Sequence, residues 1–156
     1  MPTFDYRFTI DAPQPVVLDF HRDTSVLKTL TPPPLFVQLH AVEPLGEGSK
    51  ADFTIWFGPF PIRWQAVHSK VDDQGFTDTL VTGPLKNWQH RHQFVAINNE
   101  MTQVNESIEY EFEKGVKGLV SRLMYSRASL TLLFTARKLI TKKHLRTIMR
   151  SKNVHN

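Results

Sequence analysis

The sequence predicts an α+β domain in which one antiparallel sheet wraps around a long C-terminal helix. Three observations lead to this prediction. Seven short segments alternate apolar with polar residues or are rich in β-branched and aromatic residues, and tight turn signals join the last six. The longest helical pattern of apolar residues follows the last of them. The 156 residues include 40% hydrophobic residues and no cysteine, which is enough for one core and excludes disulfides and a cysteine nucleophile.

The N-terminal part is predicted to contain one strand and two short helices. Thr3 to Ile10 alternates large apolar residues with polar ones, which is the period of a half-buried strand. Gln14 to Arg22 places apolar residues at helical spacing, with Pro15 in the first turn, where a missing N–H costs little. Residues 23 to 25 are expected to cap a second helix that ends near Leu30, because three consecutive prolines follow shortly.

The middle of the chain is predicted to form an antiparallel meander. Short β-rich runs are separated by Gly, Pro, Asn and Asp, and these connections are too short for the crossover that parallel strands need. The six predicted strands are Phe36 to Glu43, Lys50 to Phe57, Pro61 to Val71, Gly75 to Thr82, Leu85 to Ile97 and Met101 to Phe112.

The last segment is predicted to be one long amphipathic helix. Beyond Gly115 and Gly118, apolar residues recur every three or four positions, and neither proline nor glycine interrupts them. The apolar side, which includes Leu123, is broader than contact with one sheet requires. Part of it is therefore expected to border a cavity or a partner, so a monomer and a homodimer are both compatible with the sequence.

The net charge of +4 arises at the C-terminal end. Seven cations and no acid occur from Arg137 onward, whereas 12 cations and 15 acids occur before it. The expected division is a domain of residues 1–146 and a basic tail of residues 147–156. These cations either complement the helix dipole or meet an acidic partner or an anionic membrane. Because the body is mildly acidic, no nucleic-acid partner is predicted.

Other sequence features restrict the location and the function. The longest apolar runs are far shorter than the roughly 20 residues that cross a bilayer, and no signal-peptide pattern opens the chain, so the cytoplasm is the expected location. The sequence has no Gly-x-Ser-x-Gly elbow, no glycine-rich phosphate loop and no His-Glu-x-x-His motif. Hydrolase, nucleotide-binding and zincin functions therefore lack their usual sequence support.

Short motifs run along nearly the whole chain: Ile10-x-Ala12-Pro13, Leu30-Thr31-Pro32-Pro33, Phe57-Gly58, Arg63-Trp64, Phe76-x-Asp78, Gly83-Pro84, Trp88-x-His90-x-His92-x-Phe94, Thr102 through Glu106 to Tyr110, and Phe134-x-x-Arg137. Together they resemble the START, birch-pollen-allergen and polyketide-cyclase superfamily, also called SRPBCC proteins, and within it a bacterial cyclase/dehydrase-like subgroup. The chain departs from that subgroup at Glu106, where aspartate is usual, and at Leu80, where a polar residue is common.

The resemblance implies the helix-grip fold. In that fold a curved seven-stranded antiparallel sheet, in the order strand, two helices, six strands and helix, wraps around the long C-terminal helix and encloses an elongated cavity for an apolar ligand. The superfamily includes carriers of hydrophobic molecules, aromatase and cyclase enzymes, and interaction modules. The fold alone therefore does not decide the function.

The segment from Trp88 to Phe94 is the most informative for chemistry. Strand side chains alternate, so His90 and His92 share a face with the two aromatic residues, which mark that face as interior. The same rule turns Asp78 and Glu106 inward on the preceding and following strands. Because consecutive strands of a meander are neighbours, these acids and histidines are expected to pair.

Three interpretations of this cluster remain open. The four side chains satisfy one another as part of the core, or they anchor the polar group of a ligand at one end of an apolar cavity. Alternatively, they are catalytic, with a histidine acting as general base in a cyclase- or dehydratase-type enzyme that needs no cofactor. His-x-His with Glu106 also has the ligand count of a catalytic zinc site, but any alternating strand with two histidines gives this spacing, so no metal is predicted.

Aromatic residues on the predicted strands indicate the type of ligand. Large rings along a concave sheet suit a lipid, an aromatic molecule or a polyketide-like molecule, although many of them are expected only to fill the core. The first functional hypothesis is therefore binding of a small hydrophobic molecule; the alternatives are the enzyme above and an interaction module that uses the basic C-terminal helix. The predicted ligand-binding residues are Phe57, Trp64, Asp78, Trp88, His90, His92, Phe94, Glu106, Tyr110 and Leu123.

Overall fold

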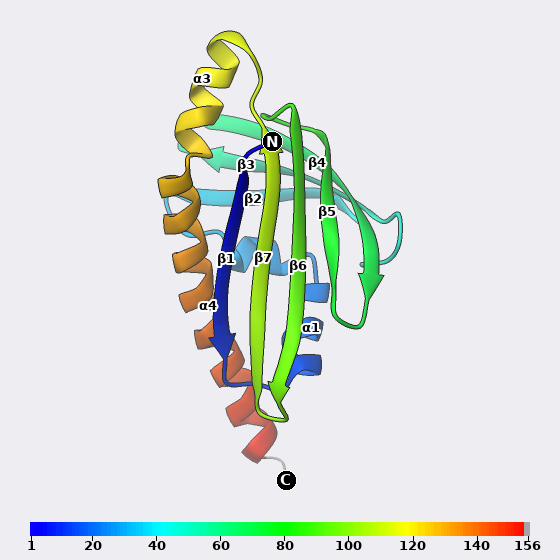
Figure 1. The fold of residues 1–156 in the computed structure, drawn as a ribbon. Helices are drawn as coiled ribbons and strands as arrows, with labels where there is room; N and C mark the ends of the chain where they lie inside the picture. The colour runs from blue at the N-terminus through cyan, green and yellow to red at the C-terminus, as the bar shows by residue number, and fades with distance from the viewer. Residues whose placement is uncertain (155–156) are drawn as a thin grey trace.

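The computed structural model describes residues 1–154 and contains one antiparallel sheet with helices on its concave side (Figure 1). The strands are β1 (Thr3–Ile10), β2 (Leu35–Val42), β3 (Lys50–Phe57), β4 (Phe60–Asp72), β5 (Gly75–Thr82), β6 (Asn87–Asn98) and β7 (Met101–Glu111). The helices are α1 (Gln14–Arg22), α2 (Val26–Leu30), α3 (Gly115–Met124) and α4 (Arg127–Val154). The predicted α+β class and seven-stranded sheet are confirmed.

The sheet is a meander of six consecutive strands, to which the first strand of the chain is added at one edge. Its strand order is β1-β7-β6-β5-β4-β3-β2, so β1 pairs with the last strand and every other pair is consecutive in the chain. The sheet curves strongly, because β2 and β3 run across the view in Figure 1 whereas β1, β6 and β7 run along it. Helix α4 lies beside β1, and helices α1 and α2 pack against α4.

The register of the middle strands follows from their alternating pattern. In β7, residues from Thr102 to Tyr110 alternate between buried and less buried positions. Asp78 is paired with His90 across β5 and β6, and His92 is paired with Glu106 across β6 and β7. These side chains therefore meet on the concave face, as the alternation predicts.

Two apolar clusters form the core, and the inward histidines lie between them. One cluster includes Trp64, Trp88 and Phe134, and the other includes Phe76 and Phe94. The ring of His90 is centred 5.5 Å from that of Phe134, in the first cluster, whereas the ring of His92 is centred 4.5 Å from that of Phe76, in the second. The polar residues thus interrupt an otherwise continuous apolar interior.

The prediction of one continuous C-terminal helix is wrong, because the helix is interrupted at Tyr125 and Ser126. The backbone N–H of Tyr125 still donates to the carbonyl of Ser121, at 2.8 Å, and ends α3. The Ser126 hydroxyl then accepts a hydrogen bond from the backbone N–H of Ser129, at 3.2 Å, as an N-cap of α4 does. Apolar spacing alone does not reveal this break. Ser126, however, is a residue type that commonly caps the start of a helix.

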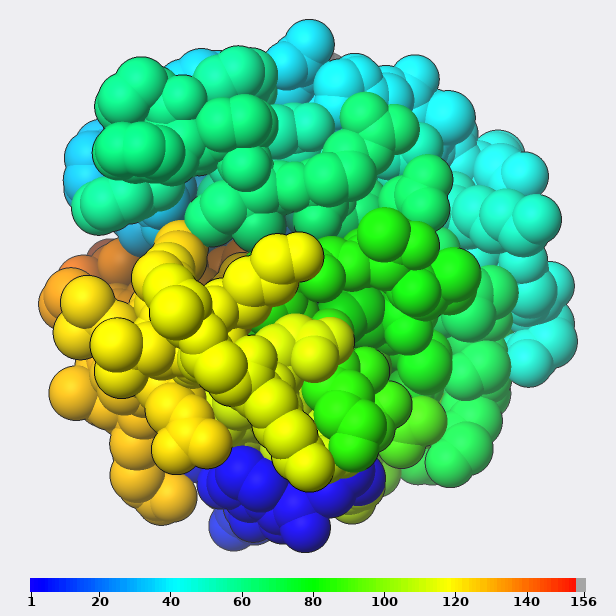
Figure 2. Space-filling view, turned by 90° about the horizontal axis from the view of Figure 1, so that it is seen from above, coloured from blue at the N-terminus to red at the C-terminus, as the bar shows by residue number. Residues whose placement is uncertain are grey.

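Helix α3 presents its apolar side to the solvent. Its buried residues are Gly118 and Ser121, and a Cβ added at Gly118 would lie 1.7 Å from the carbonyl oxygen of Glu113. Leu123 is 76% exposed, so the break in the helix turns it away from the interior. Seen from above, α3 lies next to the β3–β4 turn and the N-terminal residues (Figure 2).

Helix α4 continues through residue 146 to Val154 without interruption. Ile148 and Met149, in the segment expected to be a basic tail, pack against the second apolar cluster. None of the helices within residues 1–154 is long and apolar enough to cross a membrane.

Candidate functional site

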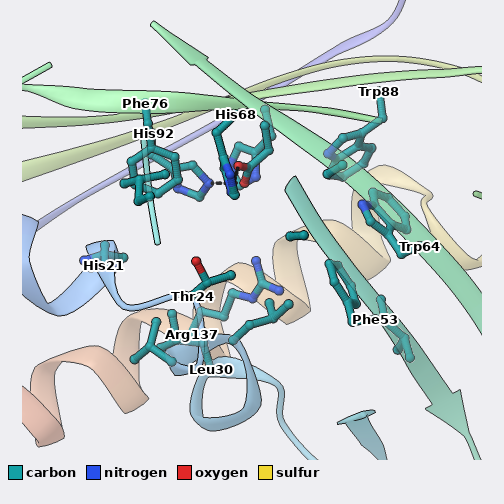
Figure 3. A pocket seen from close by; sticks show the side chains of 18 of the residues that line it. His21, Thr24, Leu30, Phe53, Trp64, His68, Phe76, Trp88, His92 and Arg137 are labelled. Carbon is teal, nitrogen blue, oxygen red and sulfur yellow. Dashed lines mark hydrogen bonds and ion pairs between the residues drawn. The ribbon is translucent and has the colours of Figure 1, made fainter. Parts of the chain in front are cut away.

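A cavity of about 150 Å³ lies between the concave face of the sheet and the helices (Figure 3). An apolar cavity of similar size accommodates a benzene molecule, so this one is large enough for a single aromatic ring. Leu27 and Leu30 from α2 and Leu133 from α4 line the helix side. The sheet side divides into an aromatic part and a polar part.

Aromatic residues form the first part of the wall. The rings of Trp64 and Trp88 meet edge to face, with their centroids 5.5 Å apart. The ring of Tyr125 lies 6.2 Å from Trp64 and 5.7 Å from Trp88, and Phe53 stacks on Trp64 at 6.2 Å. Edge-to-face and offset contacts of this kind fix ring positions as well as burying area. This wall is therefore a preformed surface for an apolar or aromatic group.

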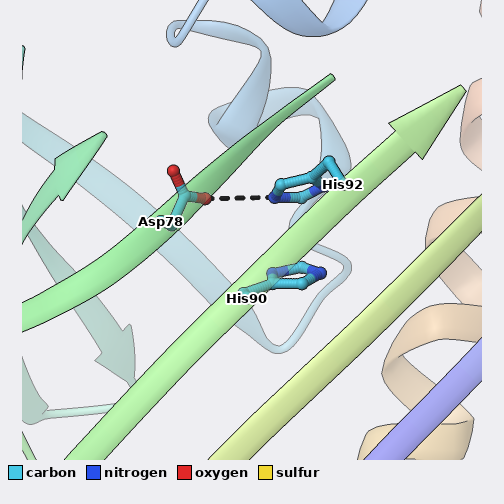
Figure 4. Close-up of side chains that lie close together, drawn as sticks. All are labelled: Asp78, His90 and His92. Atoms are coloured by element: carbon cyan, nitrogen blue, oxygen red, sulfur yellow. Dashed lines mark hydrogen bonds and ion pairs between the residues drawn. The ribbon is translucent and has the colours of Figure 1, made fainter. Parts of the chain in front are cut away.

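Histidines and carboxylates form the second part of the wall in a continuous chain. His90 Nε2 donates to Glu106 Oε2 at 2.8 Å, and the same oxygen lies 2.8 Å from His92 Nδ1. His92 Nε2 donates to Asp78 Oδ2 at 3.0 Å (Figure 4). The other oxygen of Asp78 lies 3.1 Å from His68 Nε2. The chain of contacts is therefore His90, Glu106, His92, Asp78, His68, and the predicted pairing is present.

His92 carries the positive charge of this network. Burial alone would lower its pKa, but the negative charges of Glu106 and Asp78 outweigh burial and raise the pKa to about 10. Burial would raise the pKa values of the two carboxyl groups, yet their histidine partners hold both well below the usual range. Near neutral pH, His92 is an imidazolium between two carboxylates.

His90 is neutral in the same network. Burial lowers its pKa, and the charge of His92, whose ring centroid is only 3.8 Å away, lowers it further against the opposing effect of Glu106. Because Nε2 faces a carboxylate oxygen, the proton of the neutral ring belongs on that nitrogen and Nδ1 keeps its lone pair. Two histidines on one strand thus have different protonation states.

Two further histidines line the cavity and were missed from the sequence. The Nδ1 of His68 is 2.8 Å from the Ser49 hydroxyl, while its other nitrogen faces Asp78. Continuing the inward alternation of Trp64 along β4 would have placed His68 on the same face. His21 donates from Nδ1 to the carbonyl of Val17 at 2.8 Å, and burial lowers its pKa to about 4, so it is neutral.

Arg137 also lines the cavity, on the helix side. From the sequence, Arg137 was counted among the seven cations of the C-terminal end, and the structure places it in the cavity wall instead. In Figure 3 its side chain extends from α4 toward the space beneath His68 and His92. Its position three residues after Phe134, on the apolar face of α4, was the available sequence signal.

The predicted ligand-binding residues occupy three kinds of position. The residues that line the cavity are Trp64, Asp78, Trp88, His90 and His92. Those that are buried but outside its lining are Phe94, Glu106 and Tyr110. Those that are exposed, Phe57 near the β3–β4 turn and Leu123 on α3, do not form part of the wall. Glu106 acts on the cavity only through the two histidines that it contacts.

Asp78, His90 and His92 also bring possible metal ligands together, with ligand atoms within 4.8 Å of one another. This set differs from the sequence-based one, because Asp78 takes the place of Glu106. Each nitrogen of His92 and Nε2 of His90 already faces a carboxylate oxygen. A metal would have to displace protons from these contacts, so the arrangement favours protons over a metal.

Comparisons with known proteins establish the fold. No protein-family model matches the chain, and neither does any curated protein. The Zhui aromatase/cyclase from Streptomyces sp. R1128 is 12% identical, with a TM-score of 0.68 over 91% of this chain and 94% of that one. Norcoclaurine synthase from Thalictrum flavum, in complex with dopamine and hydroxybenzaldehyde, is 17% identical, with a TM-score of 0.68 over 93% and 87%.

A START superfamily protein from Mycobacterium smegmatis is 10% identical, with a TM-score of 0.70 over 94% of this chain and 98% of that one. At these identities the comparisons concern the fold alone. The chain has the SRPBCC/START-like helix-grip fold, and that prediction is confirmed.

Proposed function

We propose that the protein binds a small hydrophobic molecule in the cavity between the sheet and α4. The observation that carries this proposal is the two-part wall: packed aromatic rings at one end and a buried polar network at the other. Binding sites for small molecules commonly combine an apolar lining with a few fixed polar groups. The fold neighbours are consistent with this function, since the norcoclaurine synthase structure holds two single-ring aromatic molecules.

The polar end orients the ligand in this proposal. His90 and His92 present a neutral and a charged ring side by side, and Asp78 holds the charged one in place. Trp64 and Trp88 cover the apolar part of the ligand. A cytoplasmic location remains a prediction.

A cavity-filling variant tests the proposal. Ala66 is buried and lines the cavity, so Ala66→Phe places a ring in the space the ligand needs, and Ala51→Leu fills less of it. Ala96→Phe makes the same change at an exposed position of β6 and is the matched control. Calorimetric titration with phenylacetamide, a neutral single-ring probe, should give binding to the wild type and to the control. Either filling variant that remains folded should lose it.

Equal binding by folded filling variants and the wild type would place the probe elsewhere and overturn the proposal. Absence of binding by the wild type would also contradict it. Circular dichroism of each variant establishes folding before the titration is interpreted.

One observation favours a second function, that of a cyclase- or dehydratase-type enzyme. His90 and His92 are adjacent histidines, but their environments lower the pKa of the first and raise that of the second. Such a separation of pKa values between two titratable groups is typical of acid–base sites. The lone pair on His90 Nδ1 would be the general base. A His90→Gln variant should then lose turnover of a β-hydroxyacyl thioester probe while keeping its affinity; equal turnover by variant and wild type would exclude this role.

A further inference from the structure

Arg137 is the one charged group of the cavity wall, among residues 1–154, that has no polar partner. Its side chain is partly buried, the buried Nε–H has no acceptor, and the guanidinium forms neither a hydrogen bond nor an ion pair with the described residues. Its aromatic neighbour is Phe134, whose ring centroid lies 5.3 Å from the guanidinium carbon. A guanidinium has five N–H donors, and here the protein uses none of them.

This arrangement is unusual for a cation whose Nε lies in the interior. Burying a charge is unfavourable unless it is paired, and buried polar groups normally have partners. Burial does lower the pKa of Arg137, but arginine remains charged in proteins. Helices α2, α3 and α4 contain no acidic residue, and the one acid of α1, Asp19, is exposed and lies beside Arg22.

The carboxylates of the sheet wall do not supply the missing partner. Asp78 is engaged by His68 and His92, and Glu106 by His90 and His92. With His92 charged, these groups carry one net negative charge, which attracts Arg137 through space. That attraction uses the charge of the guanidinium but leaves its directional donors unoccupied.

We propose that the cavity takes a small aromatic carboxylate whose carboxylate group is held by Arg137. This inference rests on the proposed binding function and names its ligand class. A carboxylate is planar and accepts two parallel hydrogen bonds from the fork of an arginine. It also brings one negative charge, whereas a phosphate dianion would bring more charge close to Asp78 and Glu106.

Size and lining specify the rest of the ligand. A volume of about 150 Å³ suits one aromatic ring with a short side chain. The ring would pack against Trp64 and Trp88, while Arg137 approaches from the opposite wall (Figure 3). Phenylacetate meets both requirements, and phenylacetamide is its neutral counterpart of nearly identical shape.

The test compares these two probes by calorimetric titration of the full chain. The wild type should prefer phenylacetate to phenylacetamide by about 10- to 100-fold, the range expected for charge-assisted hydrogen bonds in a buried site. Arg137→Gln should remove this preference to within about twofold while binding of phenylacetamide persists. Arg137→Lys keeps the charge without the fork and should retain only part of the preference.

Arg127→Gln is the matched control, because it makes the same change at an exposed position of the same helix. It should leave the preference unchanged. Equal affinity of the wild type for acid and amide would overturn the carboxylate inference while leaving the proposed binding function intact. A preference that survives Arg137→Gln would overturn it as well, and failure of the wild type to bind either probe would contradict both proposals.

Discussion

The two walls of the cavity differ in whether their charged side chains have polar partners. On the sheet side, Asp78, His92 and Glu106 form ion pairs with one another, although Asp78 Oδ1 and His92 Nδ1 make no hydrogen bond. On the helix side, Arg137 has no polar partner among the described residues. The comparison indicates that the sheet network serves first to hold the strands and the cavity wall in place, whereas the arginine is available to an incoming group.

The difference follows from how each element is built. Neighbouring antiparallel strands bring side chains into register, so Glu106 faces His92 and Asp78 faces His90 across the ladder. A helix has partners only at three or four positions away, and the neighbours of Arg137 on α4 are Leu133, Phe134, Ile140 and Thr141. The guanidinium of Arg137 is therefore surrounded mainly by apolar side chains and by the cavity.

The largest expected effect concerns Glu106, which contacts both histidines of β6. Glu106→Gln removes the negative charge and leaves buried His92 with one ionic partner, so the free energy of unfolding should fall by about 3–5 kcal/mol. Urea denaturation measures the change. Glu109→Gln, at an exposed position of the same strand, should have little effect, and a similarly small loss for Glu106→Gln would show that the network does not stabilise the sheet.

The pH dependence of stability gives the next largest effect. The pKa of His92 is raised from 6.5 to about 10 in the folded state, so its stabilising contribution is complete below about pH 6.5 and is lost progressively as the pH rises to 10. The carboxyl groups of Asp78 and Glu106 have depressed pKa values, so their contribution is lost as the pH falls below their unfolded-state range near 4. His21 and His90 act in the opposite direction to His92, because their lowered pKa values make the unfolded chain take up protons first as the pH falls below 6.5. Stability should therefore be highest near pH 6.5 and should decline on both sides.

Thermal unfolding of the wild type and His92→Gln across pH 5 to 10 measures this dependence. The variant should be less stable at pH 6 and should lose much of the alkaline decline. An alkaline decline of the same size in both proteins would assign the titration to another group.

The smallest effect is expected on the helix side. Arg137→Met removes a partly buried charge that has no polar partner and keeps much of its apolar volume, so the free energy of unfolding should change by less than about 1 kcal/mol. The urea denaturation used for Glu106→Gln compares the two walls directly. A loss as large as that of Glu106→Gln would show that Arg137 is part of the structural network after all.

The sequence predicted the sheet side better than the helix side. Alternation along β6 has a strict period, and no register shift occurs between Trp88 and Phe94, so the inward side chains were identified correctly. Strand order then brought Asp78 and Glu106 to the same place. His68 was missed because the alternation along β4 was not followed inward beyond Trp64. Trp64, Ala66 and His68 are all buried, so the alternation persists, although the pairing with β5 shifts between Gln65 and Ala66 and again after Ser69.

The predictions for the helix side were wrong for a different physical reason. Apolar spacing reports which residues share a face but not where a helix stops, so Leu123 was predicted to face inward although the break at Tyr125 turns it outward. Arg137 was counted as a solvated charge because a count of charged residues does not show which way each side chain points. Its spacing from Leu130 and Phe134 places it on the buried face of α4.

The most direct test of the binding account uses the three tryptophans as reporters. Trp64 and Trp88 line the cavity, whereas Trp56 lies outside it and donates from Nε1 to Gln38 at 3.0 Å. A ¹H–¹⁵N NMR titration with phenylacetate follows all three indole N–H signals at once. The account predicts saturable shifts of the Trp64 and Trp88 signals with no shift of Trp56. Unchanged Trp64 and Trp88 signals, or a shift confined to Trp56, would contradict it.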